Sequence, residues 1–174
     1  MPLSISNFAK VISSGGTYVD KTDFLAKIIQ RGGNAFYFSR PRRFGKTLTV
    51  STLEYLFSGR RDLFKGLAIE KHLDEEKFAP RPVLRLDMSL IKTDAGLPEF
   101  RVSLANHTKL RARLLGVELP SDYSADFALY DLIVTLGEKS SNGIAVLIDE
   151  YDAPLVNFLN QPDLCETLRK IMHT

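Results

Sequence analysis

The feature that most constrains the fold of this chain is the alternation of short strand-like segments with long helical ones. Three segments have the length, composition and flanking residues of strands: 34–39, 82–89 and 144–148. The last is a continuous apolar run, which is typical of a strand that is covered on both faces. Strands that are joined by helical stretches pair in parallel and carry helices on both faces of the sheet. The sequence therefore predicts an α/β fold with a mostly parallel sheet.

Helical periodicity fills the intervals between these segments. Asp20 or Thr22 can cap a first helix within residues 18–33, and the glycines at its end terminate it. Further helical or amphipathic segments are expected at 47–57, 98–115, 125–139, 153–159 and 164–172. The 47–57 segment is rich in serine, threonine and valine, which are poor helix formers, so we expect tertiary packing to hold it.

Composition and length narrow the class of protein. The chain is 44% apolar and 25% charged, which is ordinary for a globular protein and excludes a disordered or collagen-like one. We expect residues 1–174 to form a single domain. A formal net charge of +2 gives no global basic field. The sequence shows neither a secretory signal nor a membrane-spanning run, and it has one cysteine, Cys165. These features favour a cytoplasmic protein without a membrane partner.

Residues 40–47, RPRRFGKT, align with the phosphate-binding loop G-x-x-x-x-G-K-[ST]. The second half of the pattern matches, with Gly45, Lys46 and Thr47 in place. Gly45 lets backbone amides approach phosphate oxygens without a side chain in the way. The helix that follows presents unpaired amides and the positive end of its dipole to an anion. Lys46 supplies a positive charge for the β- and γ-phosphates, and Thr47 supplies a hydroxyl for Mg²⁺. The segment is therefore the predicted nucleotide-binding loop.

The first half of this loop departs from the general pattern. Arg40 replaces the leading glycine, and Pro41 fixes the backbone angle beside it. Arg42 and Arg43 offer direct cationic contacts to phosphates, and Phe44 completes the loop. The alternatives to a nucleotide site are a solvated basic turn and a nucleic-acid-binding patch.

A second motif, Asp149 followed by Glu150, comes directly after the apolar run 144–148. Ligands of open parallel sheets bind at the carboxyl ends of the strands. Asp149 is suited to hold Mg²⁺ through water or the threonine hydroxyl, and Glu150 to orient and deprotonate an attacking water. The predicted metal ligands are thus Thr47 and Asp149, and the predicted catalytic residues are Glu150 and Lys46. A strand that simply ends in acidic residues is the structural alternative.

Four blocks of sequence extend these motifs over most of the chain. They are YVDKTDFLAKII at 18–29, FYFSRPRRFGKTLTVSTLEYLFSGRRDLFKGLAI at 36–69, PVLRLDMS at 82–89 and VLIDEYDAPL at 146–155. Together they resemble the predicted AAA-ATPase-like family of prokaryotic proteins. The resemblance implies a P-loop NTPase three-layer sandwich of the additional-strand class, with ATP and Mg²⁺ as ligands. It also implies that RPRRFGK[ST] is the usual phosphate loop of the family.

The resemblance implies further parts that the sequence does not show. Sheets of this class contain another strand, which carries a polar γ-phosphate sensor and follows the acidic strand in sequence. Residues 164–174 look helical instead. We expect a chain that is truncated at its C-terminus; the alternatives are a degenerate chain and a sheet that is completed in another way. Many members carry a nuclease-like domain of the PD-(D/E)XK type after the ATPase part. A nucleotide is therefore the expected partner, self-association is left open, and nucleic acid is expected only through such a downstream domain.

The function that the motifs favour is an ATP-binding and ATP-hydrolysing core that depends on Mg²⁺. The alternatives are a non-catalytic nucleotide-binding or interaction module and a basic nucleic-acid-binding module. Other polar residues have structural explanations. The three histidines lack metal-ligand spacing, Asp152 is expected to cap the helix near 153, and the basic residues of 98–115 are expected to face solvent.

Overall fold

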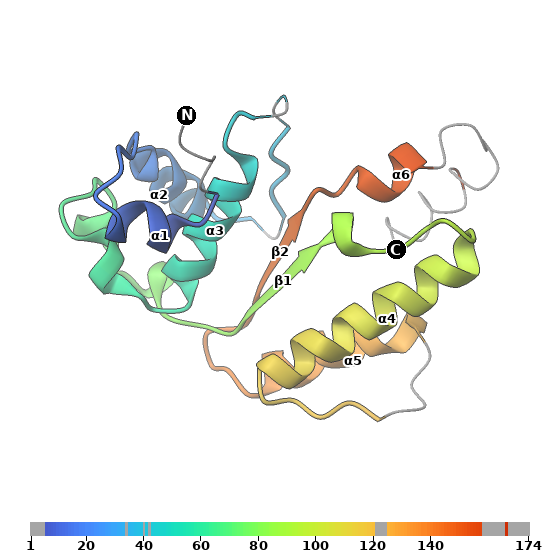
Figure 1. Ribbon diagram of the computed structural model, residues 1–174. Helices are drawn as coiled ribbons and strands as arrows, with labels where there is room; N and C mark the ends of the chain where they lie inside the picture. The colour runs from blue at the N-terminus through green and yellow to red at the C-terminus, as the bar shows by residue number, and fades with distance from the viewer. Residues whose placement is uncertain are drawn as a thin grey trace. The chain divides into compact units, whose positions relative to one another are not determined.

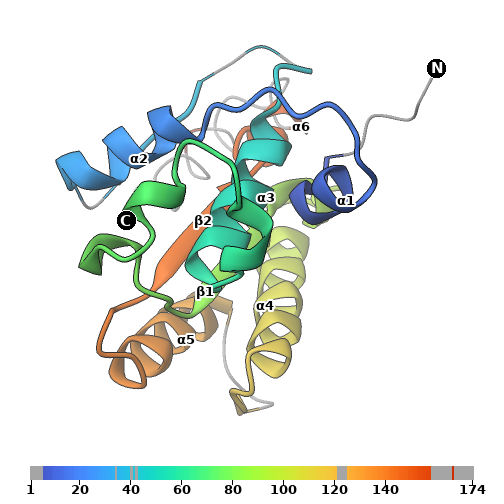
Figure 2. The same cartoon turned by 90° about the vertical axis from the view of Figure 1, so that its left-hand side faces the viewer.

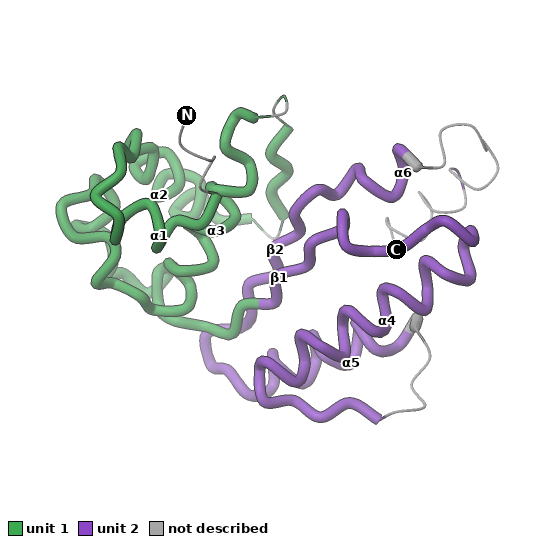
Figure 3. Tube along the Cα trace, viewed as in Figure 1, with its two compact units in different colours: residues 1–83 green, residues 84–174 purple. Residues whose placement is uncertain are grey.

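The structure is a computed structural model that describes residues 6–33, 35–39, 41, 43–120, 125–157 and 166. The chain divides into two compact units, residues 1–83 (unit 1) and residues 84–174 (unit 2) (Figure 3). Each unit has a buried hydrophobic cluster of its own. The described residues combine α-helices with a small two-stranded parallel sheet. This combination confirms the α/β class. Among the described helices, none has both the length and the apolar character that a membrane span requires.

The described part of unit 1 is helical. Its elements are α1 (Phe8–Ser13), α2 (Thr22–Arg31), α3 (Lys46–Phe57), η1 (Arg61–Phe64), η2 (Glu70–His72) and η3 (Glu76–Phe78) (Figure 1). The helices predicted within 18–33 and at 47–57 are confirmed by α2 and α3. The sequence analysis missed α1 and the 3-10 turns, because such short elements carry too little periodicity to detect.

The core of unit 1 is built around two phenylalanines. The ring centroids of Phe8 and Phe64 lie 4.9 Å apart, and the ring of Tyr18 meets Phe8 edge-on at 5.2 Å. The buried cluster around them consists of Phe8, Ala26, Leu56, Leu63, Phe64, Ile69, Leu73 and Phe78. Because Leu56 belongs to α3 and Phe8 to α1, this cluster fixes α3 against the first helix of the chain.

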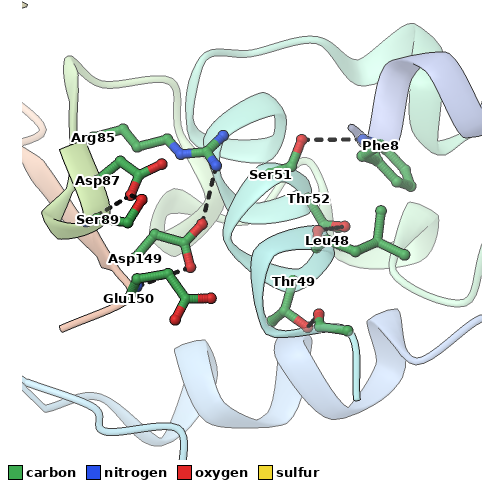
Figure 4. Close-up of polar contacts among 11 residues, drawn as sticks. Phe8, Leu48, Thr49, Ser51, Thr52, Arg85, Asp87, Ser89, Asp149 and Glu150 are labelled. Carbon is green, nitrogen blue, oxygen red and sulfur yellow. Dashed lines mark hydrogen bonds and ion pairs between the residues drawn. The ribbon is translucent and has the colours of Figure 1, made fainter. Parts of the chain in front are cut away.

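Buried polar contacts also hold α3. Ser51 and Thr52, on its inner side, are 0% and 1% exposed. The backbone amide of Phe8 donates a hydrogen bond of 3.0 Å to Ser51 Oγ, and Thr52 Oγ1 donates one of 2.8 Å to the carbonyl of Leu48 (Figure 4). The burial of Ser51 and Thr52 and the bond from Phe8 agree with the expectation that tertiary packing holds this segment.

Ser51→Ala is expected to destabilise unit 1 by about 1–3 kcal/mol, because it leaves the buried amide of Phe8 without an acceptor. Urea unfolding of the full chain measures the effect. Ser58→Ala is the matched control, since Ser58 is exposed just after α3, and its effect is expected to stay within about 0.5 kcal/mol. Equal unfolding free energies for the two variants would show that the Ser51 hydroxyl does not hold α1 to α3.

A second polar network ties α2 to the turn at residues 66–70. Asp20 Oδ1 accepts hydrogen bonds from the amide of Thr22 at 2.8 Å and from its hydroxyl at 2.6 Å. Asp20 Oδ2 accepts one from the amide of Ala68 at 2.7 Å, and Thr22 Oγ1 accepts one from the amide of Ile69 at 3.1 Å. Burial acts to raise the pKa of Asp20, but the bonds from Thr22 and Ala68 outweigh it and lower that pKa. The expected capping is wrong, because the N-cap residue of α2 is Lys21 and no side chain caps the helix. Asp20 and Thr22 instead anchor the start of α2 to the turn at 66–70.

The predicted strand at 34–39 is wrong. Asn34 lies outside the described residues, and residues 35–39 have no regular secondary structure. Their aromatic side chains are largely exposed, 50% for Phe36 and 77% for Tyr37. A strand needs a hydrogen-bonded neighbour, and the described residues of unit 1 before Val83 contain none. Strand-like composition therefore leads here to an irregular connection between α2 and α3.

Unit 2 holds the sheet, whose first strand starts at the boundary residue Val83. Its elements are β1 (Val83–Asp87), η4 (Met88–Leu90), α4 (Leu97–Leu114), α5 (Ala125–Glu138), β2 (Ala145–Asp149) and α6 (Ala153–Asn157). These confirm the strands predicted at 82–89 and 144–148 and the helical segments predicted at 98–115 and 125–139. The end of the segment predicted at 153–159, and all of 164–172 except Glu166, lie outside the described residues.

In unit 2, α4 and α5 pack together on one side of the sheet (Figure 2). Leu84 and Leu86 of β1 enter their apolar cluster, whose buried members are Leu84, Leu86, Ala112, Val117, Leu132 and Leu136. The other strand is less covered than predicted, because Val146 and Ile148 are 39% and 45% exposed. Val146 and Ile148 are two positions apart and so share one face of β2, which the described residues cover only in part.

Candidate nucleotide site

The predicted phosphate loop leads directly into α3. Gly45 is the N-cap residue and has a φ of 78°, a left-handed conformation that glycine adopts without steric strain. Lys46 and Thr47 follow as the first residues of the helix and are half-buried. The amide and the hydroxyl of Thr49 both donate to the carbonyl of Gly45, at 2.9 and 3.0 Å. These bonds fix the turn at which the loop becomes helix.

Within the part of the chain that the structure describes, the first turn of α3 has no capping side chain and no acidic residue. The first amides of an α-helix have no acceptor inside the helix, and this end carries a partial positive charge. The start of α1 differs, because the side chain of Asn7 accepts a hydrogen bond from the amide of Lys10. The start of α3 therefore offers the donors and the charge that phosphate oxygens require.

In the earlier part of the loop, the structure describes three residues. Pro41, Arg43 and Phe44 are exposed, Phe44 at 62%. Arg43 has a φ of 68°, which is uncommon for a residue other than glycine. The loop thus bends at Arg43 and again at Gly45, without the leading glycine of the general pattern. The other two predicted members, which lie outside the described residues, are Arg40 and Arg42.

In unit 2, Asp149 is the last residue of β2 and is 2% exposed. Its Oδ1 accepts a hydrogen bond of 3.1 Å from the amide of Glu150, and its Oδ2 accepts one of 3.1 Å from Arg85 Nη2 (Figure 4). A carboxylate this buried is costly unless it is paired and hydrogen-bonded. Sequence reasoning missed Arg85, although the alternation in 82–89 puts it on one face of its strand together with Asp87.

Glu150 lies in the turn that follows β2. Its φ of 48° is left-handed, and such backbone strain in a residue other than glycine costs about 1–3 kcal/mol and clusters at functional sites. The carbonyl of Glu150 accepts the amide of Ala153 at 2.9 Å, and the carbonyl of Asp152 accepts the amide of Val156 at 3.0 Å. These bonds join the acidic turn to α6. Asp152 directly precedes that helix, and its capping role stays a prediction.

The end of β1 adds a carboxylate that the sequence analysis did not single out. Asp87 Oδ1 accepts hydrogen bonds from the amide of Ser89 at 3.0 Å and from its hydroxyl at 2.6 Å. Because β1 and β2 are parallel neighbours, Asp87 and Asp149 end their strands at the same edge of the sheet. Among the described residues, no three His, Cys, Asp or Glu side chains group closely enough to hold a metal ion. A Mg²⁺ site would therefore also use other oxygen ligands, as Mg²⁺ sites with substrate phosphates do.

The structure thus brings the predicted site residues together in two groups. Gly45, Lys46 and Thr47 lie at the start of α3 in unit 1, and Asp149 and Glu150 follow one another at the end of β2 in unit 2. The expectation that both groups bind one nucleotide stays a prediction.

Comparison with known proteins shows the family of the chain. Residues 2–174 match the family described as "Predicted AAA-ATPase". The chain therefore belongs to the predicted AAA-ATPase family. It is also similar to an "Uncharacterized protein in vnfD 5'region" of Azotobacter chroococcum mcd 1, with 32% identity over 172 residues. That alignment covers 97% of this chain and 32% of the relative, so the chain spans about a third of the relative's length. No solved structure matches the chain.

Proposed function

We propose that this chain is the nucleotide-binding core of an ATPase, which binds ATP together with Mg²⁺ and hydrolyses it. The observation that carries this proposal is the uncapped start of α3, where Gly45, Lys46 and Thr47 follow one another as in a phosphate-binding loop. Membership of the predicted AAA-ATPase family supports it. The P-loop three-layer sandwich, of which the described sheet and its helices would be a part, belongs to the same proposal.

The first group of residues binds the phosphates. The amides of the first turn of α3 donate to phosphate oxygens, and the Lys46 ammonium contributes a full positive charge at the β- and γ-phosphates. The exposed side chain of Arg43 is available to the same anion. These contacts hold ATP by its triphosphate.

The second group of residues supplies the metal ligands and the base. The Thr47 hydroxyl and the Asp149 carboxylate are hard oxygen donors, which is the ligand type that Mg²⁺ takes in proteins, so the residues present fit the ion. When bound, Mg²⁺ neutralises charge on the phosphate oxygens. Glu150 orients a water for in-line attack on the γ-phosphate and accepts its proton.

A non-catalytic nucleotide-binding module is the second candidate. It is favoured by the state of Asp149, which is 2% exposed and already accepts a hydrogen bond at each carboxylate oxygen. In that case Asp149 and Glu150 stabilise the end of β2 and take no part in chemistry. Self-association, a cytoplasmic location and a nucleic-acid partner reached through a downstream domain remain predictions from the sequence.

Calorimetric titration of the full chain with ATP, with and without Mg²⁺, tests the proposal. We expect saturable binding that Mg²⁺ strengthens, accompanied by release of phosphate. Binding that Mg²⁺ leaves unchanged, with no phosphate release, would select the non-catalytic module. Absence of ATP binding in both conditions would contradict both candidates. Binding of an oligonucleotide that ATP displaces and that falls steeply with salt would instead indicate the basic nucleic-acid-binding module.

A further inference from the structure

Asp149 forms an ion pair with Arg85, a residue that belongs to neither of the two nucleotide motifs. Among the buried residues that the structure describes, Asp149 is the only one with a charged side chain. The side chain of Arg85 is 20% exposed, against 2% for that of Asp149. Burying an ionised carboxylate is unfavourable unless a cation and hydrogen-bond donors accompany it. Arg85 is therefore part of what allows a charged aspartate to end β2.

The pairing of β1 with β2 places the side chain of Arg85 next to Asp149. Arg85 lies in the middle of β1, and its neighbours Leu84 and Leu86 enter the apolar cluster of unit 2. Because successive side chains of a strand point to opposite faces, Arg85 projects from the other face of the sheet. Because Arg85 Nη2 donates a hydrogen bond to Asp149, the carboxylate of Asp149 lies on that same face.

The two donors to Asp149 approach different oxygens. Arg85 Nη2 donates to Oδ2 and the amide of Glu150 donates to Oδ1, each at 3.1 Å. The carboxylate therefore cannot rotate without breaking one of these bonds. Each carboxylate oxygen can accept about two hydrogen bonds or equivalent contacts, so each retains capacity for one further ligand.

We infer that Arg85 is a positioning residue for the Mg²⁺-binding carboxylate. It holds Asp149 in one orientation and offsets its charge, so that the remaining lone pairs of the carboxylate are presented to the ligand sphere of the ion. This inference rests on the proposed function. Partners that orient metal ligands typically change metal affinity by about 10- to 100-fold when they are removed. The opposite role, in which Arg85 competes with Mg²⁺ for Asp149, predicts that removal of Arg85 strengthens the effect of Mg²⁺.

The quantity to measure is the ratio of the ATP affinities with and without Mg²⁺, determined by calorimetry on the full chain. Arg85→Met is expected to lower this ratio about tenfold or more. Arg85→Lys is expected to restore a large part of it, because lysine returns the positive charge. Arg113→Met is the matched control, since Arg113 is exposed on α4 in the same unit, and it should leave the ratio unchanged.

A second comparison tests whether Arg85 acts through Asp149. Arg85→Met leaves Asp149 buried without its cation and can fail to fold, whereas Arg85→Met combined with Asp149→Asn removes both charges. We expect Arg85→Met to have no further effect on the ratio in the Asp149→Asn background. An equal loss in both backgrounds would overturn the inference, because Arg85 would then act independently of Asp149.

The remaining outcomes separate the inference from the proposed function. If the wild-type chain binds ATP more tightly with Mg²⁺ and Arg85→Met keeps or raises the ratio, the inference is overturned and the function stands. If the wild-type chain shows no effect of Mg²⁺ on ATP binding, the proposed function fails and the inference fails with it.

Discussion

Glu150→Gln is expected to abolish ATP hydrolysis while leaving ATP binding close to that of the wild-type chain. Glutamine preserves the size of the side chain but cannot accept a proton from the attacking water. Loss of a positioned general base lowers a rate by about 10²- to 10⁴-fold. Glu150 adopts a left-handed backbone in the turn after β2. An isosteric side chain is therefore chosen, since it removes the carboxylate without altering the size of the residue at this strained position.

Phosphate release at saturating ATP, together with calorimetric titration, measures both effects of this substitution. Glu118→Gln is the matched control, because Glu118 is exposed in the same unit and lies outside the motifs. Hydrolysis at the wild-type rate in Glu150→Gln would remove Glu150 from the catalytic step. Equal loss of binding and hydrolysis would assign it to nucleotide binding or to folding.

Lys46→Ala is expected to weaken ATP binding by roughly 10- to 100-fold, the equivalent of about 1.5–3 kcal/mol for a hydrogen bond to a charged group. The ammonium of Lys46 contributes a full positive charge at the start of α3. The amides and the dipole of the helix contribute only partial positive charge there. Alanine has the highest helix propensity, so the first turn of α3 should persist in the variant. The expected loss therefore reports on phosphate binding and not on unfolding of the helix.

Titration of Lys46→Ala with ATP measures this loss, and thermal unfolding of the same sample checks that the fold is intact. Lys65→Ala is the control in unit 1, because Lys65 is exposed and lies outside the loop. Wild-type affinity in Lys46→Ala would identify residues 40–47 as a solvated basic turn, which was the structural alternative for this segment.

Local patterns in the sequence predicted most of the regular structure. The helices α2, α3 and α5 and the strands β1 and β2 all lie within two to four residues of their expected bounds. These elements could be predicted because their signals are local to one segment. The signals are hydrophobic periodicity, the glycines after α2 and the apolar run before Asp149. The same is true of the helix start after the phosphate loop, which was predicted at Thr47 and lies at Lys46.

Features that depend on distant parts of the chain could not be predicted. The aromatic segment 35–39 has the composition of a strand, but strand formation needs a partner that composition does not supply. The exposure of Val146 and Ile148 likewise depends on what packs on their face of β2, which the apolar sequence of the strand does not indicate.

The polar contacts of the candidate site show the same limit. Arg85 and Asp149 are 64 positions apart in sequence, and their ion pair depends on the pairing of β1 with β2. The bond from the amide of Ala68 to Asp20, across 48 positions, depends on how the 66–70 turn packs on α2. An alternating strand pattern indicates which side chains share a face, but the register between strands decides which residue they meet.

The proposed function requires Thr47 and Asp149 to be ligands of one Mg²⁺ ion that is bound with the nucleotide. The most direct measurement is a double-mutant cycle of Thr47→Val and Asp149→Asn, with the Mg²⁺-dependent gain in ATP affinity as the readout. Two ligands of one ion are coupled, so we predict that the double variant loses much less than the product of the two single losses. Single losses that multiply in full, or a single variant that keeps the whole Mg²⁺ effect, would contradict a shared site.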